Sequence, residues 1–271
     1  MLLDRLYIDL INIWTVYAKQ DPLIIVYQMG KVGSRSVVES LKNSGVKPVF
    51  HLHRMISSNI ARVKAIYRKS NVAPFNERIG PILCNKISKG KRKAKIITLV
   101  REPLSRNISA FFQNLQIFIG SDKKDTDYQQ NKLVDIFLKE YSHDVPLQWF
   151  NFEFEKATGI NVYSYPFPKH KGYMKIEENN IELLLMKLEI TDTLKESVIA
   201  DFMCIDKFRL ISKNIGKDKT YSKTYQQFKK TVRLPSAYIH KMLSSQYARH
   251  FYSEKDISAL WVKWHDSQVD S

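Results

Sequence analysis

Two short stretches of the sequence carry residue types that bind phosphate. The first is GKVGSRS at residues 30–36, where glycines let the backbone curve around an anion and the other residues supply positive charge and hydroxyl donors. The second is REPLSRNIS at residues 101–109, where Arg106 and Ser109 are three positions apart and share one face of a predicted helix. A planar guanidinium binds phosphate through two parallel hydrogen bonds. The residues predicted to contact phosphate are Gly30, Lys31, Gly33, Ser34, Arg35 and Ser36 in the first stretch, and Arg101, Arg106 and Ser109 in the second.

Two histidines supply a candidate proton acceptor. His51 and His53 lie two positions apart in FHLHR, so they share one face of a predicted strand. Histidine is the side chain best suited to take a proton near neutral pH. His53 is the first candidate for a general base and His51 the second; the alternative is one structural and one solvent-exposed histidine. A metal-binding pair would need a third ligand, and none lies at an obvious spacing, so no metal is expected.

These residues need a scaffold that brings them together, and the surrounding sequence predicts one. Apolar, β-branched runs at 23–28, 47–52, 95–100 and 183–189 are typical of buried parallel strands, and helical patterns separate them. This order predicts an α/β fold with three layers, α/β/α, around a mostly parallel central sheet. Ligands bind such sheets at the carboxyl ends of the strands, where both phosphate stretches and the histidines fall. The simpler alternatives are a structural turn at Lys31 and an ion pair between Arg106 and Glu102.

The chain is predicted to form a single domain over residues 1–271. An N-terminal helix occupies residues 1–20, the α/β core residues 21–205, and a basic loop with C-terminal helices residues 206–271. The first helix is expected to pack on the domain, with a membrane-surface helix as the alternative.

Composition narrows the class of partner. The 43 Lys and Arg exceed the 27 Asp and Glu by 16, which indicates an anionic partner. Two cysteines exclude a disulfide framework or a zinc cluster. No apolar run approaches the roughly 18 residues that span a bilayer. The six Lys and Arg within residues 86–95 are expected to decorate a surface turn.

The two phosphate stretches together resemble the sulfotransferase superfamily that uses 3′-phosphoadenosine 5′-phosphosulfate (PAPS). Its members have a loop similar to QMGKVGSRS after the first strand and an element similar to REPLSRNIS after a later one. The resemblance implies a P-loop NTPase-like sulfotransferase fold, with the first loop on the 5′-phosphosulfate, the second element on the 3′-phosphate, and Lys31 stabilising the leaving phosphate. It also implies that a late basic loop closes the nucleotide pocket, with Lys219 and Tyr221 as contributors. Gly30 replaces the usual proline, as in some carbohydrate sulfotransferases.

A second resemblance covers nearly the whole chain. YQMGKVGS, LVREPLSRN, the stretch 149–163 with its W-F-x-x-E start, and YARHFY at 247–252 are similar to a bacterial family of putative capsular polysaccharide synthesis proteins. This resemblance implies a sulfotransferase that acts on a hydroxyl of a capsular or other surface glycan, anionic or neutral. The expected compartment is the cytoplasm or the inner face of the membrane, with peripheral membrane contact left open. Nucleic acid is not an expected partner.

Two other function classes stay open. A Walker-type kinase or ATPase would need a glycine at Ile25 and a hydroxyl at Val32, and the sequence has neither. A non-catalytic polyanion binder of capsule assembly would need a continuous basic face, whereas the cations singled out here gather at predicted strand ends.

Overall fold

The chain divides into two compact units. A computed structural model describes residues 11–18, 22–67, 78–90, 92–119, 129–211 and 221–265. Unit 1 consists of Met1–Val100 and Gln148–Ser212, and unit 2 of Arg101–Leu147 and Lys213–Ser271. Lys219 lies outside the described residues.

Unit 1 contains a five-stranded sheet in the order β2-β1-β3-β5-β4. Four strands are parallel, and β4 pairs antiparallel with β5. Their bounds are Leu23–Tyr27 (β1), Val49–Leu52 (β2), Ala94–Val100 (β3), Tyr173–Glu178 (β4) and Ile181–Lys187 (β5). The predicted α/β class with a mostly parallel sheet is therefore confirmed.

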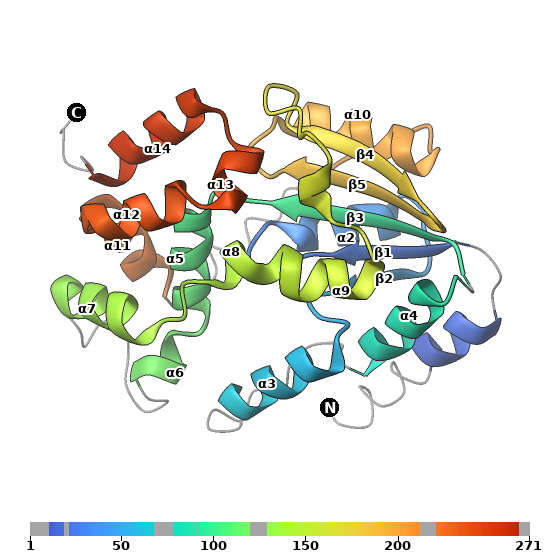
Figure 1. Cartoon of the computed structure of the whole chain (residues 1–271), viewed down its shortest axis with the longest axis horizontal. Coiled ribbons are helices and arrows are strands. Elements are labelled where there is room, and N and C mark those ends of the chain that lie inside the picture. Colours follow the sequence, from blue (N-terminus) through green and yellow to red (C-terminus); the bar gives the residue numbers. More distant parts are fainter. Residues whose placement is uncertain are drawn as a thin grey trace. The chain divides into compact units, whose positions relative to one another are not determined.

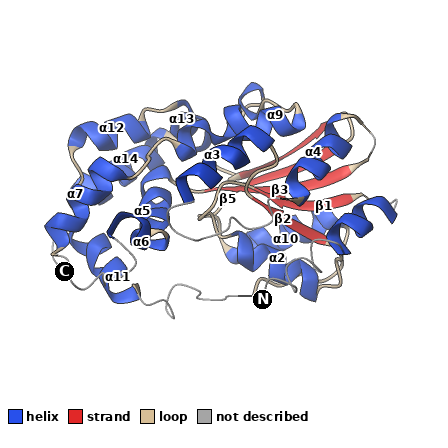
Figure 2. Ribbon diagram, turned by 90° about the horizontal axis from the view of Figure 1, so that it is seen from below, coloured by secondary structure: helices blue, strands red, loops and turns tan. Residues whose placement is uncertain are grey.

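Helices cover both faces of this sheet, which explains why its central strands are apolar on both sides. Figure 2 shows α4 and α9 on one face and α2 and α10 on the other. The helical segments of unit 1 are Ser34–Asn43 (α2), Ser57–Tyr67 (α3), Ile79–Ser88 (α4), Phe150–Phe154 (η3, a π-helix), Glu155–Thr158 (α9), Val162–Ser164 (η4) and Asp192–Met203 (α10). A further helix occupies residues 11–18, and α8, Val145–Trp149, spans the boundary between the units.

The edge strand β4 is missing from the sequence prediction. Its side chains alternate between buried and exposed, because one face of this edge strand meets solvent. Asn179 and Asn180 form the two-residue turn of a tight hairpin that leads into β5, and Asn179 has a left-handed φ of 55°. That pair between an alternating and a continuous apolar run is the signal that predicts the hairpin.

Unit 2 is helical and has its own apolar core. Its helices are Pro103–Gln113 (α5), Leu115–Ile119 (α6), Gln130–Glu140 (α7), Ser222–Thr231 (α11), Ser236–Leu243 (α12), Gln246–Phe251 (α13) and Glu254–His265 (α14). Phe111, Phe112, Phe137, Phe228 and Trp264 are buried together in the core that these helices enclose. The predicted C-terminal helices are present, and α11 lies in a region predicted only as a basic loop.

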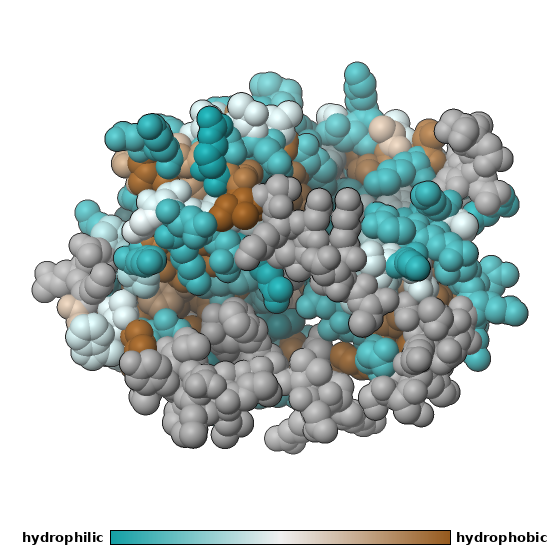
Figure 3. All heavy atoms as spheres, turned by 180° about the vertical axis from the view of Figure 1, so that it is seen from behind, coloured by the Kyte–Doolittle hydropathy of each residue, from teal (hydrophilic) through white to brown (hydrophobic). Residues whose placement is uncertain are grey.

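The face of the molecule seen in Figure 3 is predominantly hydrophilic. In the view of Figure 3, teal hydrophilic residues cover most of the coloured surface and brown hydrophobic residues form small separate areas. Among the described residues, no helix has both the length and the apolar character needed to cross a membrane.

Candidate functional site

The loop between β1 and α2 has the backbone shape of an anion cradle. Lys31 and Gly33 both have left-handed backbone conformations, with φ of 75° and 85°. A Cβ at Gly33 would lie 2.6 Å from Leu188 Cδ1, so a side chain there would also require the Leu188 side chain to move. Gly33, the N-cap residue of α2, has no side chain that could cap the helix. The first N–H groups of this helix, together with its positive dipole end, therefore face the loop.

The start of the loop is fixed to the neighbouring strand. The Thr98 hydroxyl donates to Tyr27 O over 2.7 Å, and Leu99 N–H donates to Gln28 Oε1 over 3.3 Å. Gln28 is fully buried, and its Nε2 has no partner among the described residues. Sequence reasoning missed Gln28, since a glutamine at a strand end has no distinctive pattern.

Val32 occupies the place where a Walker loop carries its magnesium-binding hydroxyl. Its side chain is apolar and 0% exposed, so it belongs to the core of unit 1. The side chain at this position therefore has no atom that could bind a metal ion.

His51 is held neutral beside the loop. Its Nε2 lies 2.8 Å from Ser34 Oγ, in the first turn of α2. Burial, followed by the charges of His53, Arg35 and Lys42, lowers the pKa of His51 from 6.5 to about 3. At neutral pH the uncharged ring therefore fixes the Ser34 hydroxyl rather than carrying a charge.

His53 presents its other ring nitrogen to the loop. Its Nδ1 lies 2.9 Å from Gln28 O, and a carbonyl oxygen can only accept, so we assign the proton to Nδ1. In the neutral ring the lone pair is then on Nε2. That atom lies 4.0 Å from where a Cβ of Gly30 would be. The Nε2 atom of His53 therefore lies next to Gly30, at the start of the lysine loop.

Two residues of the W-F-x-x-E stretch hold the chain that follows His53. Trp149 Nε1 donates to His53 O over 3.1 Å. Glu153, 3% exposed in the π-helix η3, accepts from the backbone N–H groups of Met55 and Ile56 over 2.5 and 3.0 Å. The Tyr27 hydroxyl donates to the same carboxylate oxygen over 2.6 Å, and burial followed by the Glu153 charge raises the Tyr27 pKa. This stretch was visible in the sequence, but its contact with His53 was not.

The remaining residues predicted in the first loop differ in their surroundings. Arg35 is exposed. The Ser36 hydroxyl donates to Ile211 O over 2.5 Å, and Ile211 N–H donates to Ser40 Oγ over 2.8 Å. These two hydrogen bonds fix the segment that ends at Ile211 to α2, and the first of them uses the hydroxyl proton of Ser36.

In unit 2, Arg101 follows β3 directly and its backbone is fixed by a tyrosine. The Tyr247 hydroxyl accepts from Arg101 N–H over 3.1 Å and donates to Arg101 O over 2.8 Å. Tyr247 is fully buried and begins the YARHFY stretch. Sequence reasoning did not assign it a role.

The other predicted residues of unit 2 are more enclosed. Arg106 is buried and donates to Tyr141 Oη over 2.9 Å and to Asn107 Oδ1 over 3.0 Å. Ser109 and Tyr221 are half-buried. The Glu102 carboxylate caps α5 by accepting from Leu104 N–H over 2.9 Å.

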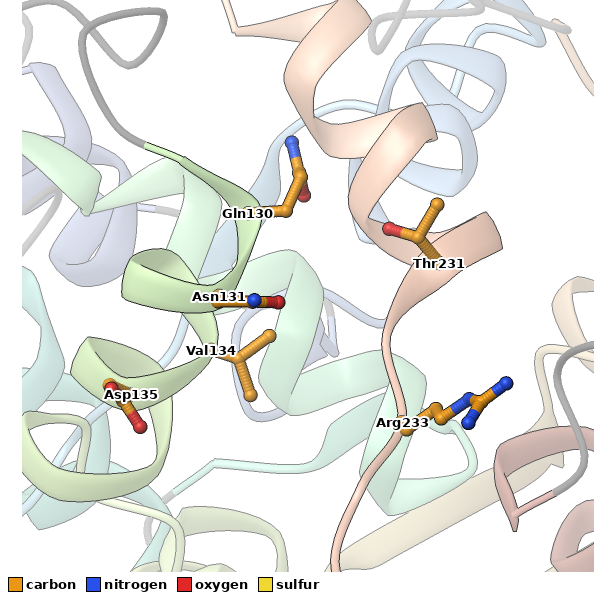
Figure 4. A pocket seen from close by; sticks show the side chains of 6 residues that line it. All are labelled: Gln130, Asn131, Val134, Asp135, Thr231 and Arg233. Carbon is orange, nitrogen blue, oxygen red and sulfur yellow. The ribbon is translucent and has the colours of Figure 1, made fainter.

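A separate hollow of about 510 Å³ lies in unit 2, between α7 and the end of α11. Figure 4 shows Asn131 and Val134 on one side and Thr231 on the other, while Asp135 and Arg233 extend away from each other. None of the predicted site residues lines it. Within the described part of the chain, no group of three or more His, Cys, Asp or Glu is placed to hold a metal ion.

Comparison with known proteins identifies one family. A family model described as putative capsular polysaccharide synthesis protein matches residues 93–253. No curated protein and no solved structure matches the chain.

Proposed function

The chain belongs to this family of putative capsular polysaccharide synthesis proteins, and from that premise we propose that it is a sulfotransferase acting on a glycan hydroxyl. The proposed donor is PAPS, and the acceptor is a hydroxyl of a capsular or other surface polysaccharide. The observation that carries the proposal is the position of His53 Nε2 beside Gly30, at the lysine loop that follows β1.

The residues of unit 1 suit an in-line displacement at sulfur. In the proposed step the acceptor oxygen forms a bond to sulfur while the bond from sulfur to the phosphate oxygen breaks. His53 Nε2 takes the proton of the acceptor hydroxyl. Lys31 and the N–H groups at the start of α2 stabilise the charge that develops on the leaving phosphate. With its proton on Nε2, neutral His51 donates to Ser34 Oγ and leaves the Ser34 hydroxyl proton for the same phosphate.

The resemblance to sulfotransferases implies that Arg101, Arg106 and Ser109 bind the 3′-phosphate of the donor, and this stays a prediction. Arg101 suits it best, because Tyr247 fixes its backbone while the burial of Arg106 favours a structural role. The buried Val32 argues against a Walker-type kinase or ATPase, because magnesium binding in that class needs a hydroxyl at this position.

Titration of the full chain with adenosine 3′,5′-bisphosphate in a calorimeter tests the donor assignment. We expect saturable binding that weakens at least about tenfold in Lys31→Ala, since one charge-assisted contact to phosphate is worth roughly that factor or more. Lys47→Ala is the matched control, because Lys47 is an exposed lysine before β2, at the opposite end of that strand from the histidines. Absence of binding, or equal loss in both variants, would refute the assignment.

His53→Asn tests the base separately from the donor site. Asparagine can keep an N–H donor for Gln28 O but has no counterpart of Nε2. We expect nucleotide affinity to be retained and the rate of sulfate transfer to an acceptor glycan to fall by roughly 10²- to 10⁴-fold. Retained transfer in this variant would exclude His53 as the base.

A further inference from the structure

One edge of unit 1 concentrates exposed apolar side chains. In Figure 1 the blue helix 11–18, α3 and α4 lie along this edge, and Figure 2 views the molecule from that side. Ile11, Trp14 and Tyr17 are 45%, 67% and 63% exposed. They recur every third residue, so they form a stripe along the outer side of the helix.

The inner side of the same helix is fixed to the unit. Val16 is fully buried, and Arg92 Nη1 donates to Val16 O over 2.6 Å. The stripe is therefore held outward by a packed helix. Ile66 at the end of α3 is also exposed, as is Phe152, whose carbonyl accepts from Asn59 of α3. Among the described large apolar residues that are exposed, only Val262 lies in unit 2.

The charge of this edge has one sign. Residues 11–18, 57–67 and 78–93 contain no Asp or Glu. The same three ranges contain seven described cations, Arg62, Lys64, Arg78, Lys86, Lys89, Arg92 and Lys93. The Lys86 ammonium lies 3.9 Å from the centre of the Tyr17 ring, so a cation of α4 contacts the aromatic stripe directly. We call helix 11–18, α3 and α4 with these residues the basic-aromatic edge.

We propose that the basic-aromatic edge docks on an anionic lipid membrane. Exposed Trp and Tyr beside lysines are the combination that enters the interface between headgroups and acyl chains. Ile11 and Ile66 gain free energy only where the partner offers apolar surface, which a membrane does and a nucleic-acid or glycan backbone does not. The lack of acidic residues matches the negative potential of the lipid surface. This proposal is independent of the sulfotransferase assignment.

Sedimentation of the full chain with lipid vesicles tests the proposal. We expect binding to vesicles of phosphatidylcholine mixed with phosphatidylglycerol, and much weaker binding to phosphatidylcholine alone. The double variant Lys89→Glu/Lys93→Glu should bind at least about 25-fold more weakly, from roughly fivefold for each cation lost. Trp14→Ser/Tyr17→Ser should also lose binding. The fluorescence of the tryptophans should shift to the blue on binding, and Trp14→Phe should remove most of that shift while retaining binding.

Controls on unit 2 separate a defined surface from general charge attraction. Lys230→Glu/Lys255→Glu changes the net charge by the same amount on α11 and α14, and both lysines are exposed. We expect this variant to bind like the wild type. Equal losses in the two charge variants would overturn the proposal. The proposal would also be overturned if the chain self-associated without vesicles and Trp14→Ser/Tyr17→Ser abolished that self-association. A second copy of the chain would then cover the edge.

Discussion

His51 and His53 are alike in sequence spacing but differ in what their rings contact. The rings lie 5.0 Å apart, edge to face. His51 contacts Ser34 through Nε2, and its burial disfavours protonation of the ring. His53 donates through Nδ1 and turns Nε2 to the lysine loop. These contacts support the proposal that His53 is the proton acceptor and that His51 orients Ser34.

The low pKa of His51 makes folding stability depend on pH in a defined direction. Its pKa is about 3 in the folded protein and 6.5 in a model peptide, so between these values the unfolded chain binds the proton. The stabilising contribution is complete above pH 6.5 and is lost as the pH falls toward 3. In this window the free energy of unfolding should fall with decreasing pH more steeply for the wild type than for His51→Gln, by up to about 1.4 kcal/mol per pH unit. Urea unfolding at pH 7.0, 6.0 and 5.0 measures this difference; parallel curves for the two proteins would contradict it.

At the scale of elements, the π-helix η3 supports the end of β1 and the start of α3 through one carboxylate. Glu153 accepts from Tyr27 at the end of β1, from Met55 and Ile56 just before α3, and from Asn59 Nδ2 within α3 over 2.6 Å. These hydrogen bonds offset the free-energy cost of burying the carboxylate, so the loss of a donor should destabilise the folded state. An extra residue in a helical turn, as in a π-helix, is often retained at functional sites.

Glu153→Gln should destabilise unit 1 more than Tyr27→Phe. In the glutamine variant a side-chain N–H₂ replaces Oε2 and meets the donor Asn59 Nδ2, whereas Tyr27→Phe removes one donor and leaves the others paired. We expect losses of about 2 and 1 kcal/mol in the free energy of unfolding. Amide exchange at Met55 and Ile56 should accelerate in the glutamine variant alone. Equal exchange in both variants would show that the carboxylate does not fix this segment.

The elements that sequence predicts well are those whose pattern is local. β1, β3 and β5 are continuous apolar runs because they are buried on both faces, and the lysine loop follows β1 directly. The two histidines lie at the end of β2, which was predicted from the run at 47–52. β4 alternates and was missed, as was α11 in a basic stretch. The residues that contact the site are harder to predict from sequence, because Glu153 contacts Met55 across 98 positions and Tyr247 contacts Arg101 across 146. A motif such as W-F-x-x-E marks such residues but does not say what they touch.

At the scale of the whole molecule, the net charge of +16 acts at long range on any anionic ligand. Much of it belongs to residues outside the lysine loop, in the basic-aromatic edge and in helices such as α11, so it should affect encounter more than the bound state. Raising the salt from about 50 to about 500 mM shortens the screening length from roughly 14 to roughly 4 Å. We expect the association rate constant of adenosine 3′,5′-bisphosphate to fall roughly tenfold. The dissociation rate constant should change by less than about twofold, since short contacts at the loop are screened little.

Stopped-flow measurement with a fluorescent analogue of this nucleotide resolves the two rate constants. Lys230→Glu/Lys255→Glu removes charge without touching any predicted site residue, so it should slow association at low salt and match the wild type at high salt. Lys31→Ala should behave in the opposite way, with faster dissociation at every salt concentration, because its charge acts by contact. If salt instead raised the dissociation rate constant and left association unchanged, the excess charge would have to act mainly within the bound complex. The distant cations would then have no part in steering the nucleotide.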